Sequence, residues 1–318
     1  MKTPPPTTLN PEPPIPNPAA AKAYAAWAFV CVIWGTTYLA IRVCLETIPP
    51  LLMGGIRFII AGGAMIAWLA LRGEALPSPR AWPSLALLGV LMLACGNGGV
   101  VWAEQTVPSG LTAVLVATSP FWMVGIDAIV PPRTPLTSRR LLGLAVGFCG
   151  IVMLVWPEVS WGSGRGFLVG VAAAQFSCVG WALGSAYSRR RGRGRARDES
   201  VLAISALQML FGGLCLTAIG LLDHEAPRLS FNLRTTLALG HLIVFGAIGG
   251  FTAFAYALKH LPIATVSLYA YINPVIAVVL GTLILKEPFS ARMMLAAGIV
   301  FFGVVLVRGN GRRWMADG

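Results

Sequence analysis

Two stretches of this sequence repeat one another: PSGLTAVLVATSPFW at residues 108–122 and PIATVSLYAYINPVI at residues 262–276. When the first prolines are aligned, the internal prolines, Pro120 and Pro274, coincide as well. Each stretch lies within a block of apolar residues. This agreement in composition and spacing indicates that the chain consists of two similar halves, which decides the fold.

The repeat continues downstream and has weaker traces upstream. PLTSRRLLGLAVGFCGIVMLV at residues 135–155 resembles PFSARMMLAAGIVFFGVVLV at residues 288–307, after a gap of one residue. Near the start of each half, Trp34 matches Trp181 in a similar apolar context. The similarity therefore extends over most of each half.

Composition places both halves in a lipid bilayer. Of the 318 residues, 56% are hydrophobic and 11% charged, with a mean hydropathy of +0.75, whereas a soluble domain has about 25% charged residues. Apolar blocks near 20 residues match the hydrocarbon thickness of a membrane. The blocks predict an all-α integral membrane protein with ten transmembrane helices, at residues 24–44, 51–71, 82–103, 110–130, 141–156, 166–187, 201–222, 237–258, 263–285 and 293–307.

Five spans in each half are an odd number, so the second half must enter the membrane in the opposite sense. The sequence therefore predicts two inverted five-helix repeats, at residues 24–156 and 166–308, between a disordered Pro-rich tail at 1–23 and a short tail at 309–318. Inverted repeats are typical of transporters that work by alternating access, because two equivalent halves can exchange conformations about a site at their interface.

The basic residues predict the orientation. If the N-terminus is cytoplasmic, 17 of the 24 Lys and Arg residues fall on the inside, six fall outside and Arg57 lies within a span. This asymmetry places both termini in the cytoplasm. The run of arginines at 189–197 is interpreted as an anchor near anionic membrane lipid, with ligand binding as the alternative. Nucleic acid is not an expected partner.

Two matched prolines and two amides lie near the middle of the membrane. Pro120 and Pro274 should kink their helices and free a carbonyl, because proline lacks the N–H that continues the helical hydrogen bonds. Their matched positions favour a role in a cavity or gate over ordinary packing. Asn97 and Asn273 need partners in lipid, and each could bond a freed carbonyl or a ligand.

Aromatic residues that carry a polar group gather in the same spans. A cavity walled by such residues suits amphiphilic metabolites such as amino acids, although lipid-facing packing is an equal alternative for each one. With the two amides, the predicted substrate-binding residues are Trp34, Tyr38, Asn97, Trp122, Trp181, Tyr256, Tyr271 and Asn273.

Ionisable residues are rare within the spans. Arg57 lies about a turn and a half into its span and is expected to reach outward to the interface. Glu104, at the outer end of the third span, is the candidate for proton coupling, with a role as a rim residue as the alternative. No metal-ligand cluster, catalytic triad or phosphate loop occurs, so the sequence predicts neither a metal nor a cofactor.

Several motifs in this order and spacing resemble the EamA family of the drug/metabolite transporter superfamily. They are WGTTYLAIR at 34–42, PPLLMGGIRF at 49–58, AEQTVPSGLTAVLVATSPF at 103–121 and YAYINPVIAVVLGTLILKEPFS at 269–290. The likeness runs from about residue 27 to 307. In one departure from the family pattern, the second half has Lys286–Glu287–Pro288, whereas the first half lacks the acid.

The resemblance implies ten helices in two inverted repeats, cytoplasmic termini and a carrier in the cell inner membrane, often an exporter of amino acids or other metabolites. It also implies a central cavity that the eight residues above would line. We therefore expect a transporter and no enzyme. A channel, a polytopic membrane enzyme and a lipid or lipid-linked flippase are the alternatives. Substrate identity and oligomeric state are not predicted.

Overall fold

The computed structural model describes residues 18–130, 136–160, 164–193, 200–261, 263–266, 268–287 and 290–308. Within these ranges every regular element is a helix. Most of the two predicted tails, at 1–17 and 309–318, lies outside the described residues.

The first repeat contributes five membrane-crossing segments, of which the third and fourth are composite. In chain order its helices are α1 (Pro18–Cys44), α2 (Pro50–Leu71), η1 (Pro79–Ala81), α3 (Trp82–Leu88), η2 (Gly89–Asn97), α4 (Gly98–Ala103), α5 (Ser109–Val116), α6 (Ser119–Ile129) and α7 (Ser138–Ser160).

The second repeat has the same plan, again with composite third and fourth segments. Its helices are α8 (Gly164–Arg193), α9 (Val201–Leu222), η3 (Ala226–Arg228), α10 (Leu233–His241), η4 (Leu242–Gly249), α11 (Gly250–His260), α12 (Ile263–Val266), α13 (Tyr269–Ile284) and α14 (Ala291–Arg308). The predicted fold of ten helices in two inverted repeats is confirmed.

Seven helical segments of the described chain are long and apolar enough to cross a bilayer: Ala21–Cys44, Pro50–Leu71, Pro79–Ala103, Ser109–Ile129, Arg165–Arg191, Val201–Leu222 and Leu233–His260. Tyr269–Ile284 and Ala291–Val307 are shorter apolar helices. The first helix begins at Pro18, earlier than the sequence suggested. Proline is tolerated there because the first helical residues need no N–H partner within the helix.

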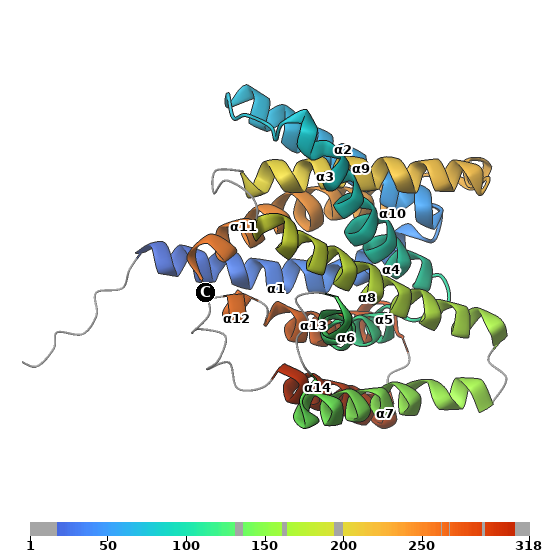
Figure 1. Cartoon of the computed structure of the whole chain (residues 1–318). Helices are drawn as coiled ribbons and strands as arrows, with labels where there is room; N and C mark the ends of the chain where they lie inside the picture. Colours follow the sequence, from blue (N-terminus) through green and yellow to red (C-terminus); the bar gives the residue numbers. More distant parts are fainter. Residues whose placement is uncertain are drawn as a thin grey trace, which may run out of the picture.

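The two repeats pack against each other, and most long helices have their main partner in the other half. α2 packs along α9, and α1 packs against α13 and α11. α7 and α14, the last helices of the two repeats, lie side by side at one edge of the bundle (Figure 1). The contact surfaces of these helix pairs form the interface of the two halves.

Glycine allows α7 and α14 to approach closely. A Cβ at Gly303 would lie 2.6 Å from the backbone nitrogen of Gly147 and 2.7 Å from the carbonyl oxygen of Gly143. Small residues that bring helix backbones together are typical of membrane helix pairs, which gain their stability from packing rather than from the hydrophobic effect.

The third segments of both repeats contain a π-helix, η2 in the first and η4 in the second. A π-helix is rare and marks functional sites in many proteins, because it displaces side chains from the regular helical positions. Each π-helix contains glycine and is followed directly by glycine, Gly98 after η2 and Gly250 after η4. The two halves therefore share a local irregularity that adjoins the central cavity described next.

Candidate functional site

A cavity of about 260 Å³ lies between the two repeats. Six helices of the first repeat (α1, α2, η2, α4, α5 and α6) and three of the second (α8, α11 and α13) contribute to its wall. Its residues are Trp34, Thr37, Tyr38, Arg57, Gly96, Asn97, Val100, Ala113, Val116, Ala117, Ser119, Pro120, Met123, Ser177, Trp181, Phe251, Tyr269, Ala270, Asn273 and Pro274. We call it the central cavity.

Five of the eight residues predicted to bind substrate line the central cavity: Trp34, Tyr38, Asn97, Trp181 and Asn273. Both predicted gating prolines line it as well. The structure therefore brings together residues from the beginning, middle and end of the chain. Whether they contact substrate stays a prediction.

Trp34 forms the centre of an aromatic wall. Its ring centroid lies 5.0 Å from Tyr269, 5.2 Å from Phe254 and 5.4 Å from Phe251. The indole N–H donates to the carbonyl oxygen of Gly246 at 3.0 Å. Because this donor is already used, Trp34 offers a ligand its aromatic surface rather than a hydrogen bond.

The two amides have different roles. With its nitrogen turned toward two carbonyl oxygens, Asn273 donates to Cys31 at 2.9 Å and to Tyr269 at 3.0 Å. It thus ties α13 to α1. Asn97 has no side-chain hydrogen bond within the described part of the chain, and its amide lies at the cavity wall. Of the two, Asn97 is the one whose hydrogen-bonding groups remain free for a ligand.

The matched prolines lie at different positions in their helices, Pro120 at the start of α6 and Pro274 inside α13. The helix of the fourth segment ends at Val116, and Pro120 is the second residue of α6, a position where no N–H is needed. The carbonyl of Val116 accepts instead from the hydroxyl of Ser119 at 2.6 Å. Pro274 lies inside α13, where it leaves the carbonyl of Ala270, four residues earlier and at the cavity wall, without its usual helical partner. Gating by these prolines stays a prediction.

The other three predicted binding residues lie away from the central cavity. The indole of Trp122 donates to Oε1 of Gln175 at 2.9 Å, toward α8. Tyr256 stacks on His260, with ring centroids 4.3 Å apart. Tyr271 packs 6.2 Å from Phe301 of α14. These aromatic groups serve helix packing in this conformation.

Arg57 does not reach the interface, so that expectation is wrong. The residue is only 3% exposed and lines the central cavity. Its Nε and Nη1 atoms are buried and have no hydrogen-bond partner among the described residues. The sequence offered one signal, a single arginine inside an apolar span, but it could not show that this face of α2 turns inward.

Glu104 lies just beyond the third span and is fully buried. Neither carboxyl oxygen has a hydrogen-bond partner in the part of the chain that the structure describes. Its backbone carbonyl accepts from Nη1 of Arg42. Burial, followed by the proximity of Glu287, raises the pKa of Glu104 well above its ordinary range, and Arg42 acts in the opposite direction. The expectation of a rim residue therefore fails, because rim carboxylates are solvated.

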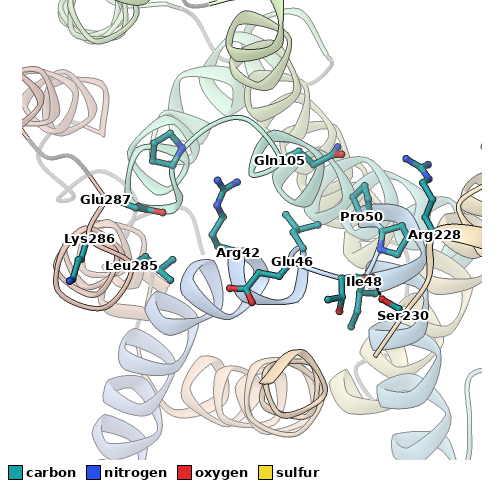
Figure 2. Close-up of a pocket in the computed structure, with 14 residues that line it drawn as sticks. Arg42, Glu46, Ile48, Pro50, Gln105, Arg228, Ser230, Leu285, Lys286 and Glu287 are labelled. Atoms are coloured by element: carbon teal, nitrogen blue, oxygen red, sulfur yellow. Dashed lines mark hydrogen bonds between the residues drawn. The ribbon is translucent and has the colours of Figure 1, made fainter. Parts of the chain in front are cut away.

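A second, larger pocket of about 850 Å³ opens at the end of the bundle where α1 ends and α2 and α5 begin. Figure 2 shows Arg42, Glu46, Lys286 and Glu287 around it. We call it the end pocket. Arg42 lies one turn after Tyr38 on the same face of α1, so this face passes from the central cavity to the end pocket.

Glu287 fastens the end of the fourth segment of the second repeat to the start of the fourth segment of the first. Its Oε1 accepts from the backbone N–H of Ser109 at 2.9 Å, and Oε2 accepts from the Ser109 hydroxyl at 3.0 Å and the Gly110 N–H at 3.1 Å. A carboxylate at a helix N-terminus is favourable because the first N–H groups have no helical partner. Lys286, with φ of 54°, turns the chain so that Glu287 reaches α5.

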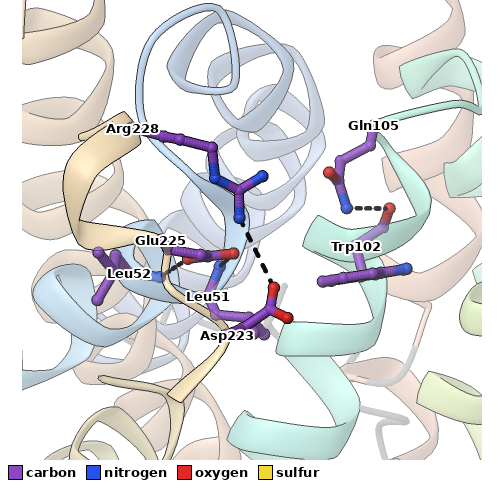
Figure 3. A network of polar contacts seen from close by, with 7 residues as sticks. All are labelled: Leu51, Leu52, Trp102, Gln105, Asp223, Glu225 and Arg228. Atoms are coloured by element: carbon purple, nitrogen blue, oxygen red, sulfur yellow. Dashed lines mark hydrogen bonds and ion pairs between the residues drawn. The ribbon is translucent and has the colours of Figure 1, made fainter. Parts of the chain in front are cut away.

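Glu225 binds the first backbone N–H groups of α2 at this end of the bundle, as Glu287 does for α5. Its two oxygens accept from the backbone N–H groups of Leu51 and Leu52, at 3.3 and 2.8 Å, and the residue is fully buried (Figure 3). Nearby, Arg228 and Asp223 form an ion pair at 3.7 Å. Sequence inspection missed Glu225, whose partners are 173 and 174 residues away.

Comparisons with known proteins agree with this architecture. The uncharacterized inner membrane transporter YedA of Escherichia coli (strain K12) is 38% identical over 279 residues, which cover 87% of each chain. The S-adenosylmethionine/S-adenosylhomocysteine transporter of Chlamydia trachomatis serovar L2 is 27% identical over 290 residues, covering 86% of this chain and 85% of that protein. A solved crystal structure with 21% identity has the same fold, with a TM-score of 0.64 over 92% of this chain and 99% of that one.

The sequence profile of the EamA-like transporter family matches this chain twice, over residues 22–156 and 168–309. The two matches cover most of the chain, and each falls on one of the five-segment halves. The chain therefore belongs to the EamA-like transporter family of the drug/metabolite transporter superfamily, and it is a multi-pass membrane transporter rather than an enzyme.

Proposed function

We propose that this transporter exports small amphiphilic metabolites, amino acids or related compounds, by alternating access through the central cavity. The observation that carries the proposal is the wall of that cavity, to which both inverted repeats contribute. A site at the interface of two inverted halves becomes accessible from either side when the halves rock against each other. The mixture of aromatic surface and a few free polar groups suits a small amphiphilic solute.

In this proposal the end pocket is the outer side, and Glu287 and Glu225 hold that side closed. Each carboxylate joins helix termini far apart in the sequence, so opening this end must break these bonds. The acid of the Lys286–Glu287–Pro288 motif has no counterpart in the first half. The opposite end would therefore lack an equivalent of the Glu287 contact, and the two gates would have different stabilities.

The proposed location is the cell inner membrane with both termini in the cytoplasm. The excess of basic residues on the side of the termini supports this orientation, and YedA of Escherichia coli is named as an inner membrane transporter. Tags on either terminus should be accessible only from the cytoplasm. A terminus labelled from the periplasm would reverse the direction assigned to the gates.

Proton coupling through Glu104 is part of the proposal. A buried carboxyl without hydrogen-bond partners takes up and releases a proton readily when its surroundings change. Glu104→Gln should leave exchange of substrate intact and abolish the dependence of net flux on a pH gradient. If the net flux of the variant depended on the pH gradient as that of the wild type does, Glu104 would not be the coupling residue.

The function is tested by overproducing the protein in cells, challenging them with toxic amino-acid analogues and profiling the medium. Trp181→Ala should remove the resistance that the wild type confers at equal membrane abundance, because Trp181 lines the central cavity. Trp156→Ala is the matched control, since Trp156 is 63% exposed on α7. Full activity of Trp181→Ala would contradict transport through this cavity.

A further inference from the structure

The guanidinium of Arg57 is a cation at the interface of the two repeats, without a counter-charge among the residues that the structure describes. Ion pairs among the described residues join Arg189 to Asp127, Arg228 to Asp223 and Arg234 to Glu46, and none involves Arg57. Two of its three guanidinium nitrogen atoms, Nε and Nη1, have no hydrogen-bond partner in the described ranges of the chain. The centroid of the Phe58 ring lies 4.9 Å from Cζ of Arg57.

The surrounding helices leave room for this group. A Cβ at Gly246 of η4 would lie 3.2 Å from Nη2 of Arg57 and 3.0 Å from the methyl carbon of Thr37. Glycine at this point of the π-helix therefore makes space for the guanidinium beside α1. The group has a defined position at the cavity wall.

An unpaired buried charge is costly, so its presence requires an explanation. A charged side chain at membrane depth is strongly unfavourable unless it meets an opposite charge or water, and a lone buried ion costs several kcal/mol. The described structure supplies no carboxylate within ion-pair distance of Arg57. No described residue fills this role, so a solute that enters the central cavity is the candidate partner.

The remaining wall restricts what that partner is. The free amide of Asn97 and the aromatic surfaces of Trp34 and Trp181 line the same cavity as Arg57. Its volume of about 260 Å³ corresponds to about nine water molecules at roughly 30 Å³ each. A planar guanidinium matches a singly charged carboxylate, which accepts two parallel hydrogen bonds.

We propose that Arg57 anchors the carboxylate of the transported solute, so that this transporter selects small carboxylic acids and zwitterions with an apolar body. This inference rests on the proposed function, since it identifies the substrate class of the same cavity. The carboxylate binds the guanidinium at the cavity wall, while the apolar body packs against Trp34 and Trp181. Arg57 is thus the residue that determines specificity for an anionic group.

The test compares acids with their amides, which differ in charge at nearly constant shape. Calorimetry on the purified full-length protein would measure 3-phenylpropanoate against 3-phenylpropanamide and L-leucine against L-leucinamide. The wild type should bind at least one acid about 10- to 100-fold more tightly than its amide, the range for a charged hydrogen-bonded contact. Arg57→Gln should reduce the affinity for the acid to that for the amide, and Arg57→Lys should restore part of the difference.

Arg72→Gln is the matched control, because Arg72 is exposed beyond the other end of α2 and stacks on Trp68. Its acid-to-amide ratio should equal that of the wild type. If Arg57→Gln is not monodisperse, Gly246→Ala takes its place, since the new methyl group crowds Nη2 and should weaken acid binding more than amide binding. Equal binding of acid and amide by the wild type, no binding of either acid, or an unchanged ratio in the variants would overturn the assignment.

Flux measurements in proteoliposomes separate this inference from the proposed function. Equal flux of the acid and its amide in both the wild type and Arg57→Gln would contradict the carboxylate site but support the transport function. Charge-selective binding without any movement across the membrane would reject the proposed function and leave the site in place.

Discussion

Replacing Glu287 with alanine should loosen the start of α5 without unfolding the bundle. The carboxylate accepts the N–H groups of Ser109 and Gly110 and the Ser109 hydroxyl. Hydrogen bonds to a charged group contribute about 1.5–3 kcal/mol each, but three bonds to one carboxylate are not additive. We expect a loss of about 2–3 kcal/mol in the free energy that holds this end closed, which is a factor of roughly 30–150 in the opening equilibrium.

Hydrogen–deuterium exchange measures this loss directly. The first N–H groups of a helix have no helical acceptor, so the protection of the Ser109 and Gly110 amides depends on Glu287. Peptides that overlap at these residues should exchange roughly 30–150 times faster in Glu287→Ala, in proportion to the opening equilibrium. Glu287→Gln should have a smaller effect because it keeps one oxygen acceptor.

Glu46→Ala is the control for the loss of a carboxylate at the same end of the molecule. Glu46 is exposed and pairs with Arg234 of α10 at 3.0 Å, so its ion pair does not involve α5. Unchanged exchange at Ser109 and Gly110 in Glu287→Ala, or an equal increase in Glu46→Ala, would refute the reasoning that Glu287 closes this end.

Three other predictions concern proton binding, packing and orientation. Because the pKa of Glu104 is raised, the folded protein binds more protons than the unfolded chain. The melting temperature in detergent should therefore fall as the pH rises above the ordinary pKa range of a glutamate. Glu104→Gln should flatten this dependence. Gly303→Val should separate α14 from α7 and lower the melting temperature, since its Cβ would overlap Gly147, whereas Gly298→Val on the same helix meets open space and should match the wild type. Reporter fusions at both termini should be active only in the cytoplasm, and periplasmic activity of either would contradict the orientation.

The fourth segments of the two repeats differ around their matched prolines. The residue before each proline, Ser119 or Asn273, uses its side chain to bond a carbonyl one turn earlier. Ser119 bonds the carbonyl of Val116 in its own segment, whereas the longer amide of Asn273 also bonds Cys31 of α1. In the first repeat the helix is interrupted at residues 117–118 and Pro120 lies in the first turn of α6, whereas α13 continues through Pro274. The loop that follows the fourth segment differs as well, because the second repeat has Glu287 there and the first repeat has no acid.

Part of the site was predictable because its residues are unusual for a membrane span. Amides, paired prolines and tryptophans within apolar blocks identified Asn97, Trp34, Trp181 and both prolines as candidates, and the structure places all of these at the central cavity. Trp122 looked equivalent to Trp34 in sequence, but its indole turns to Gln175 of α8. The direction of a side chain around a membrane helix cannot be deduced from apolar periodicity, since lipid and protein neighbours are both apolar.

The amino-acid order alone was enough to establish a membrane protein of ten helices in two opposed repeats, because apolar length and repeated proline spacing are local properties of the chain. Only the packed structure revealed that Arg57 is buried without a counter-charge and that Glu287 and Glu225 cap helices more than 170 residues away. These features depend on which helix faces meet across the two halves. Contacts of that kind arise from tertiary packing, and no pattern within a single span encodes them.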